Sequence, residues 1–381
     1  MLQKILTFFQ KETVLSISAI LAILSMFIVH PSGKYFSYID FRTLSLLFSL
    51  MSIVAGLSEI GLFDYLAEKI LSRANSIKSI IVLLVLLCFF FSMIITNDVA
   101  LITFVPLTII ILKKMSEKQK NYWILRTVVM QTIAANLGSM LTPIGNPQNL
   151  YLYARANMSA LALIRLMLPY SIAALVLLLV WIQIAAHREP GSTTENHISE
   201  LFSIHKTKAP NQTSLIGYLI LFLICLLVVA HIIDYRISFI LVSGYIFFKN
   251  WHLFKKVDYS LLLTFTALFI FIGNLKCIPQ FNHFLISIID GHETLTAILS
   301  SQIISNVPAA ILLSGFTKNY SALIIGTNIG GLGTLIASMA SLISFKYIAK
   351  EKTTLRGKYF MMFTIANIVF LILLLLCINL L

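Results

Sequence analysis

The chain has 381 residues, of which 59% are hydrophobic and only 11% are charged. Soluble domains carry about a quarter charged residues, so this composition excludes an ordinary soluble protein and indicates a polytopic membrane protein. The net charge of +13 does not indicate nucleic-acid binding, because the basic residues form short clusters between apolar segments. The four cysteines, Cys88, Cys225, Cys277 and Cys377, stand singly and predict neither a metal site nor a disulfide framework.

Apolar segments separated by short polar connectors predict an all-α fold. The chain begins with a basic and then apolar stretch, which we interpret as an uncleaved first helix. The one long polar connector, 187–211, is predicted to be a cytoplasmic linker between a first membrane half, 1–186, and a second, 212–381. The apolar segments lie near 13–30, 43–68, 79–112, 121–158, 160–186, 212–233, 237–248, 259–275, 294–317, 319–345 and 359–380.

The positions of the basic residues predict the orientation. Lys4 and Lys11 precede the first span, which predicts a cytoplasmic N-terminus and, by counting spans, a C-terminus outside. All but seven of the 28 Lys and Arg residues then fall on the cytoplasmic side or at its edge. The seven exceptions are Lys34, Arg42, Arg155, Arg165, Arg236, Lys276 and Lys318.

Two segments are short for two full membrane spans. Segment 79–112 lies between basic clusters that both favour the cytoplasm, so a re-entrant hairpin with its tip near 96–98 is expected, although two short spans also fit. In the second half, "TLTAILSSQIISNVPAAILLSGFT" has about 11 residues on each side of "SNVP", or roughly 16 Å of helix per arm. Its tip is expected near 305–308, and it enters from the opposite face.

An internal repeat links the two halves. "ANLGSMLTPIGNPQNL" aligns with "TNIGGLGTLIASMASL" at a constant offset, so that Asn136 matches Asn328 and Gly138 matches Gly330. Glycines and prolines interrupt both stretches, which predicts broken helices near 136–149 and 326–341. Broken helices offer half-helix N-termini to anions and free carbonyls to sodium ions. The sequence therefore predicts two inverted-topology repeats, each with a re-entrant helical hairpin and a broken transmembrane helix.

The motifs "TNDVALITFVPL", "LTPIGNPQN" and "SNVPAAILL" resemble those of the ion transporter superfamily, which includes divalent-anion/sodium symporters, citrate carriers, arsenite permeases and sodium/proton antiporters. The resemblance implies a scaffold part, a moving transport part and a homodimer. The tip Thr96-Asn97-Asp98 is closest to the arsenite and antiporter branches, whereas Ser305-Asn306-Val307 lacks the final hydroxyl of the divalent-anion symporters. The predicted substrate- and ion-binding residues are Thr96, Asn97, Asp98, Asn136, Gly138, Thr142, Pro143, Gly145, Asn146, Ser305, Asn306, Val307, Thr327, Asn328, Gly330 and Thr334.

Sodium is expected near Asn97, Asp98 and Asn136, and near Asn306 and Asn328. Asp98 stands in an apolar segment, where an ionisable side chain is functional by default. One interpretation is that it binds a coupling cation or carries a proton. The alternative is that its carboxylate caps the second arm of the hairpin.

The function predicted from these features is a secondary active transporter that moves a small anion by alternating access, coupled to sodium or protons. A sodium/proton antiporter and a channel-like membrane subunit of an efflux complex remain alternatives. An enzyme is not expected, because the chain has no Gly-x-Ser-x-Gly or HExxH motif. We expect contact with membrane lipid and a bacterial inner-membrane location. No cofactor is expected beyond a coupling sodium ion or proton.

Overall fold

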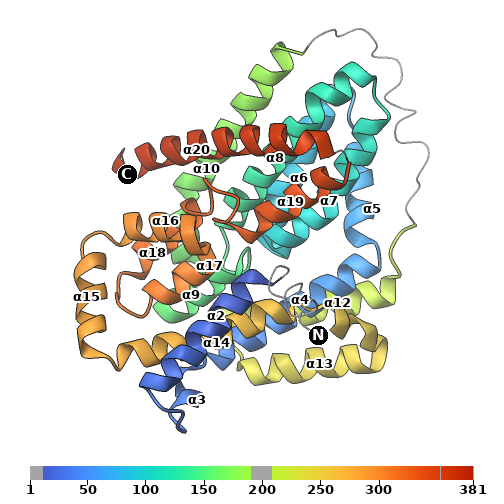
Figure 1. The fold of residues 1–381 in the computed structure, drawn as a ribbon. Coiled ribbons are helices and arrows are strands. Elements are labelled where there is room, and N and C mark those ends of the chain that lie inside the picture. Colours follow the sequence, from blue (N-terminus) through green and yellow to red (C-terminus); the bar gives the residue numbers. More distant parts are fainter. Residues whose placement is uncertain (1–11, 190–207, 352, 381) are drawn as a thin grey trace.

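The computed structural model describes residues 12–189, 208–351 and 353–380 (Figure 1). Within these ranges the chain forms helices and no strand, as the predicted all-α class requires. Seven of the described helices are long and apolar enough to cross a membrane, by length and composition. Part of the predicted linker (190–207) and the N-terminal residues Lys4 and Lys11 lie outside the described residues.

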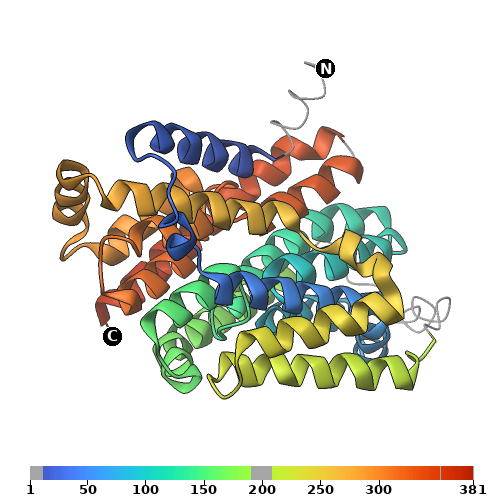
Figure 2. The same ribbon diagram turned by 90° about the horizontal axis from the view of Figure 1, so that it is seen from below.

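One set of helices forms the lower layer of Figure 1, and we call it the lower group. It comprises α2 (Thr13–Ile28), α3 (Tyr35–Tyr38), α4 (Phe41–Glu59), α12 (Gln212–Val229), α13 (Tyr235–Asn250), the 3-10 helix η2 (Trp251–Lys256) and α14 (Tyr259–Lys276). Its long helices lie side by side when seen from below (Figure 2), with α2 packed on α14 and α4 packed on α12 and α13. Aspartates begin three of them: Asp40 accepts a hydrogen bond from Thr43 N, Asp234 accepts one from Arg236 N, and Asp258 accepts one from Leu261 N.

The remaining long helices form the upper group. It comprises α6 (Ile77–Ile95), α7 (Asn97–Lys113), α8 (Glu117–Ser139), α9 (Pro147–Ala156), α10 (Ala160–His187), α16 (Glu293–Ile304), α17 (Asn306–Leu313), α18 (Tyr320–Ile329), α19 (Met339–Glu351), the 3-10 helix η3 (Thr353–Leu355) and α20 (Arg356–Leu380). Two shorter helices, α5 (Leu62–Leu71) and α15 (Pro279–Ile289), connect the groups along the chain. Helix α8 is the centre of the upper group, because α6, α7, α10, α19 and α20 all pack against it.

The two predicted hairpins differ in length. Helices α6 and α7 meet at Thr96, and α6 alone, with 19 residues, has the length of a full span. Helices α16 and α17 meet at Ser305 and have only 12 and 8 residues, which correspond to about 18 and 12 Å. Neither of these arms reaches across a hydrocarbon core of about 30 Å.

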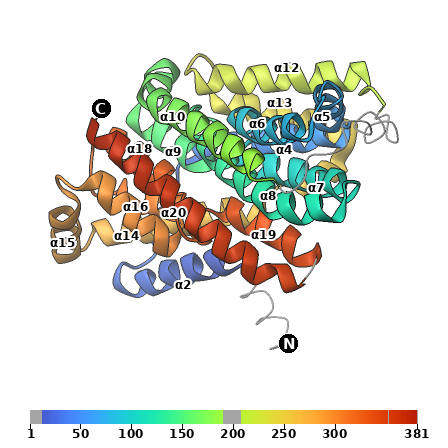
Figure 3. The same ribbon diagram turned by 90° about the horizontal axis from the view of Figure 1, so that it is seen from above.

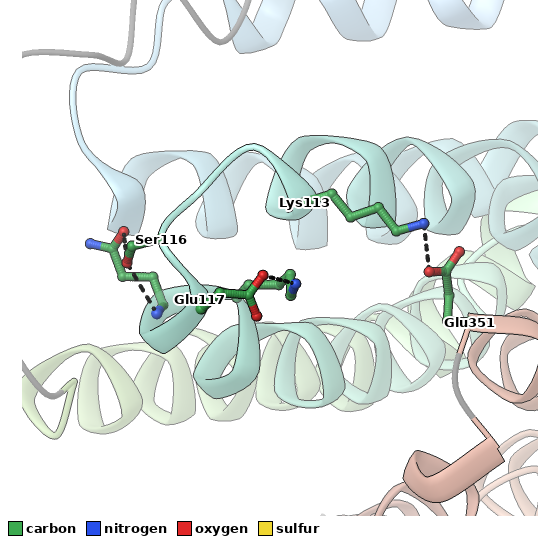
Figure 4. Close-up of polar contacts among 6 residues, drawn as sticks. Lys113, Ser116, Glu117 and Glu351 are labelled. Atoms are coloured by element: carbon green, nitrogen blue, oxygen red, sulfur yellow. Dashed lines mark hydrogen bonds and ion pairs between the residues drawn. The ribbon is translucent and has the colours of Figure 1, made fainter.

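The predicted helix breaks also have counterparts in the structure. Helix α8 ends at Ser139 and α9 begins at Pro147, while α18 ends at Ile329 and α19 begins at Met339. At one end of the upper group, the last turns of α7 and α19 are joined by an ion pair of 2.6 Å between Lys113 Nζ and Glu351 Oε2 (Figure 4). The Lys113 side chain is half exposed, so this pair contributes at most about 1 kcal/mol.

Candidate functional site

The two hairpin tips have the same unusual backbone. Thr96 has φ 78° and ψ 153°, and Ser305 has φ 73° and ψ 153°, a region that is almost restricted to glycine. Such a conformation costs on the order of 1–3 kcal/mol and persists only where the surroundings enforce it. Residues in these regions cluster at functional sites, so both tips are candidates for binding.

Each tip is fixed to a helix break by one backbone hydrogen bond. Asn97 N donates to Gly145 O at 3.1 Å, and Asn306 N donates to Ala337 O at 2.9 Å. The threonines of the breaks make a second matching pair of contacts, because Thr142 Oγ1 donates to Met93 O and Thr334 Oγ1 donates to Gln302 O. Met93 and Gln302 each precede the residue at the tip by three positions.

Two predicted glycines allow the hairpins to approach the broken helices. A Cβ added at Gly138 would lie 2.0 Å from Phe89 O and 2.7 Å from Ser92 Oγ. One added at Gly330 would lie 2.6 Å from Gly326 O and 2.9 Å from Ser301 Oγ. Only a residue without a side chain fits at either position.

A first cluster of amides joins the tip of the first hairpin to both broken helices. Asn97 Nδ2 donates to Asn136 Oδ1 at 3.0 Å, and Ser338 Oγ donates to the same oxygen at 3.0 Å. Asn136 Nδ2 donates in turn to Ser341 Oγ at 3.4 Å. The structure thus brings together Asn97 and Asn136, as predicted, and adds two serines that were not among the predicted residues.

A second cluster lies between the helix breaks of the two halves. Asn146 Nδ2 donates to Asn328 Oδ1 at 3.0 Å, and Asn328 Nδ2 donates to Asn149 Oδ1 at 2.5 Å. Asn149 was not predicted, although it stands in the quoted motif "LTPIGNPQN". An amide three residues after Asn146, at the start of a half-helix, is the signal that would have identified it.

Several predicted residues have roles that do not involve the amide clusters. Thr327 is buried, and its hydroxyl donates to Leu323 O of its own helix. Pro143 and Val307 are buried, whereas Thr334 is exposed. The side-chain amide of Asn306 lies near Gly331, since a Cβ added at Gly331 would be 3.0 Å from Asn306 Nδ2 and 3.2 Å from Asn328 O. The side chain of Asn306 and the backbone carbonyl of Asn328 thus both lie beside Gly331, and the second sodium site near Asn306 and Asn328 stays a prediction.

The Asp98 carboxylate makes no hydrogen bond to either amide cluster in the described chain. It lines a cavity of about 230 Å³ between the two helix groups, together with Thr96 and Asn146 from the upper group and Val54 and Leu261 from the lower group. Among the described residues, Asp98 Oδ1 is buried without a hydrogen-bond partner. It is Asn97 Oδ1 that accepts a hydrogen bond from Asp98 N at 3.0 Å. In the described chain, therefore, the Asp98 carboxylate accepts no capping hydrogen bond from a backbone amide.

The edge of this cavity is charged. Lys256 and Asp258 also line it, and Lys256 Nζ forms an ion pair of 2.6 Å with Glu59 Oε2. Asp258 is used as the cap of α14. The cavity thus contains two carboxylates and one lysine that is already paired, which favours a cation beside Asp98.

A second cavity, of about 270 Å³, also borders α9. Arg155 and Lys276 line it, and neither makes a hydrogen bond or ion pair in the part of the chain that the structure describes. Tyr151 stands at its inner wall, where its hydroxyl is 2.8 Å from Ser314 Oγ and its ring packs against Phe265 and Phe269. Asp40, also in the wall, is engaged with Thr43. The net charge of this wall is positive.

Known proteins resemble this chain over most of its length. A model of the citrate transporter family matches residues 5–319. An uncharacterized transporter of Methanocaldococcus jannaschii is 35% identical over 87% of this chain and 87% of its own. The inner membrane protein YbiR of Escherichia coli is 32% identical over 85% of this chain and 84% of its own. The P protein of Homo sapiens is 31% identical over 33% of this chain and 15% of its own.

The apolar helices and these relatives together define an integral membrane transporter rather than an enzyme. The chain belongs to the citrate transporter family. The predicted resemblance to the wider ion transporter superfamily is thereby confirmed. The residues of the amide clusters lie within residues 5–319, except for Asn328, Ser338 and Ser341.

Proposed function

We propose that the chain is a secondary active transporter that moves a small anion by alternating access, coupled to sodium or protons. The observation that carries this proposal is Asp98: a carboxylate oxygen buried without a partner among the described residues, on a cavity between two helix groups. In a membrane protein an ionisable group in such a place marks an ion pathway by default.

We infer that the halves of the chain, 1–186 and 212–381, are inverted-topology repeats with re-entrant hairpins. The matching contacts of the two tips support this, because Asn97 with Gly145 and Asn306 with Ala337 are the same contact made twice. In this arrangement the upper group is the transport part and the lower group is the scaffold on which a homodimer forms. The N-terminus is then cytoplasmic and the C-terminus outside.

The two cavities are the two ends of the transport route in this proposal. The cavity with Asp98 is next to Lys256 and so faces the cytoplasm, and the cavity with Arg155 and Lys276 faces outside. Helix α9 borders both cavities, and in this proposal its Tyr151, whose ring packs against Phe265 and Phe269, separates them. Movement of the upper group against α14 would transfer access from one cavity to the other.

In this proposal, different residues bind the coupling cation and the transported anion. The Asp98 carboxylate takes the sodium ion or the proton, and the amide oxygens of Asn97 and Asn136 are further candidates for sodium ligands. The anion binds near Asn146, because α9 begins directly after it and places the partial positive charge of its N-terminus there. A small carboxylate such as citrate is the first substrate to test, since the family is that of citrate transporters.

A sodium/proton antiporter is the second candidate. It is favoured by the excess of carboxylates over unpaired cations in the cavity with Asp98. The two cations of the other cavity, Arg155 and Lys276, have no carboxylate partner in the described chain, which favours the anion transporter. A channel-like subunit has less support, because the ring of Tyr151 separates the two cavities in this proposal.

Flux into proteoliposomes tests the proposal. Uptake of labelled citrate, and then of a panel of carboxylates and oxyanions, is measured under an imposed sodium or pH gradient, with protein-free liposomes as the control. We expect saturable uptake of at least one anion that a gradient accelerates. Sodium flux driven by a pH gradient with no anion requirement would identify the antiporter. Flux that neither saturates nor responds to gradients would identify a channel.

A further inference from the structure

A large hollow among the described residues lies away from the candidate transport site. It is a groove of about 740 Å³ between α8, α10 and α20. Helices α10 and α20 cross the front of the molecule when it is seen from above (Figure 3), so the groove is on the side of the upper group that faces away from the lower group. The proposed function makes no use of it.

The walls of the groove are apolar and face outward from two membrane-spanning helices. Val180 and Ile184 of α10 are 49% and 47% exposed, and Met361 and Ile365 of α20 are 65% and 53% exposed. Both helices have the length and hydropathy of a membrane span. In a membrane such walls are in contact with hydrocarbon, so an acyl chain matches their chemistry.

One end of the groove is basic. Arg126, in the third turn of α8, and Lys358, in the first turn of α20, line it there, and Asn121 adds an amide. Arg126 Nη1 donates to Tyr122 O at 2.6 Å, and the guanidinium lies 3.9 Å from the centre of the Tyr122 ring, which holds it in place. Lys358 is exposed and makes no hydrogen bond or ion pair in the described ranges. None of the described residues that line the groove is a carboxylate.

We propose that this groove is a binding site for an anionic phospholipid. The phosphate of the headgroup binds Arg126 and Lys358, and an acyl chain lies along Val180, Ile184 and Ile365. The charge argues for this occupant: a guanidinium fixed on a tyrosine ring keeps free N–H donors for phosphate oxygens, and basic pockets between membrane helices recognise anionic headgroups. An apolar helix of a second protein would leave both cations without a partner.

Native mass spectrometry of the purified chain tests the proposal with phosphatidylglycerol and phosphatidylcholine as probes. We expect phosphatidylglycerol to bind more tightly than phosphatidylcholine. The double variant Arg126→Gln/Lys358→Gln should lose about 25-fold in its affinity for phosphatidylglycerol, since each basic group near an anionic headgroup contributes about fivefold. The matched control is Lys346→Gln/Lys350→Gln, which removes two exposed cations of α19 that do not line the groove. The control should bind phosphatidylglycerol as the parent does.

A second variant obstructs the groove without altering its charge. Ile365→Trp adds bulk at a half-exposed position and should also weaken phosphatidylglycerol binding. Equal affinity for both lipids, or unchanged phosphatidylglycerol binding in the Arg126→Gln/Lys358→Gln variant, would overturn the proposal. So would dimers that dissociate in the Ile365→Trp variant while lipid binding is unchanged, because the groove would then be a protein interface. None of these readouts depends on which substrate is transported.

Discussion

The side chain of Asn146 donates a hydrogen bond of 3.0 Å to the side chain of Asn328, a residue 182 positions later in the chain. Both are buried, and both stand at a helix break. The bond therefore joins the two halves of the chain at the point where each half departs from helical geometry. The side-chain nitrogen of Asn328 in turn donates a hydrogen bond to the side-chain oxygen of Asn149.

Removing one partner of this pair should destabilise the protein. In Asn328→Ala the buried amide of Asn146 and the side-chain oxygen of Asn149 lose a partner, which costs about 1–3 kcal/mol for each group left unsatisfied. Thermal unfolding in detergent measures the effect. The double variant Asn146→Ala/Asn328→Ala should cost less than the sum of the single changes, by about 0.5–3 kcal/mol. Strictly additive effects would mean that the two side chains do not interact.

The glycines at the helix breaks should tolerate no side chain. Gly138→Ala places a Cβ against Phe89 O, and Gly330→Ala places one against Ile298 Cα and Ser301 Oγ, so we expect losses of about 1–3 kcal/mol and reduced transport. Gly244→Ala is the matched control, because a Cβ there meets nothing within 4 Å inside α13. It should be neutral or slightly stabilising. If Gly138→Ala is as stable and as active as Gly244→Ala, then α6 and α8 do not pack as closely as the structure shows.

The orientation of the chain is testable by labelling. Ser116 lies before α8 and Asp290 after α15, and in the proposed topology they are on opposite faces of the membrane. In a Cys277→Ser background, which removes the exposed native thiol, Ser116→Cys should react only from the cytoplasmic side and Asp290→Cys only from outside. Reaction of both from one face would contradict the inverted hairpins.

The outward cavity should attract the anion. Arg155→Gln and Lys276→Gln each remove an unpaired cation from its wall, so the apparent KM for the anion should rise with little change in kcat. The difference from the parent should shrink as salt increases, because salt screens exposed charges. Lys318→Gln, which does not line this cavity, should leave the KM unchanged. Equal KM values for all three variants would show that the anion does not bind in this cavity.

The sequence predicted the local features of the site because they depend on residue type. Positions that interrupt an apolar run, such as Gly138 and Gly330, are visible in the sequence, and so is the match of Asn136 to Asn328. Asn97 and Asn136 were expected near one sodium ion, and in the structure their side chains are joined by a hydrogen bond.

The cavity at Asp98 was not predicted, because it depends on packing between distant segments. Its wall combines α4, the break before α9 and the start of α14, and no short-range pattern places these together. The contribution of Ser338 and Ser341 was missed because the glycines of the second helix break were taken as its main signal. The sodium site expected near Asn97, Asp98 and Asn136 stays a prediction, and the structure adds that Asp98 lines this cavity.

The most direct test of the central claim compares Asp98→Asn with Asp258→Asn. Both remove a carboxylate from the wall of one cavity, and asparagine still caps α14 in the second variant. Gradient-driven anion uptake in proteoliposomes is measured for each. Our account predicts that Asp98→Asn lowers the apparent affinity for the coupling ion by about 5- to 150-fold, the usual range of coupling between two sites.

The response to the two gradients identifies the coupling ion. A sodium site should lose apparent sodium affinity in Asp98→Asn with little change in pH response, whereas a proton site should lose its pH dependence. Asp258→Asn should transport as the parent does. Uptake by Asp98→Asn near the parent rate, with an unchanged response to both gradients, would contradict the claim that this carboxylate couples ion movement to anion transport.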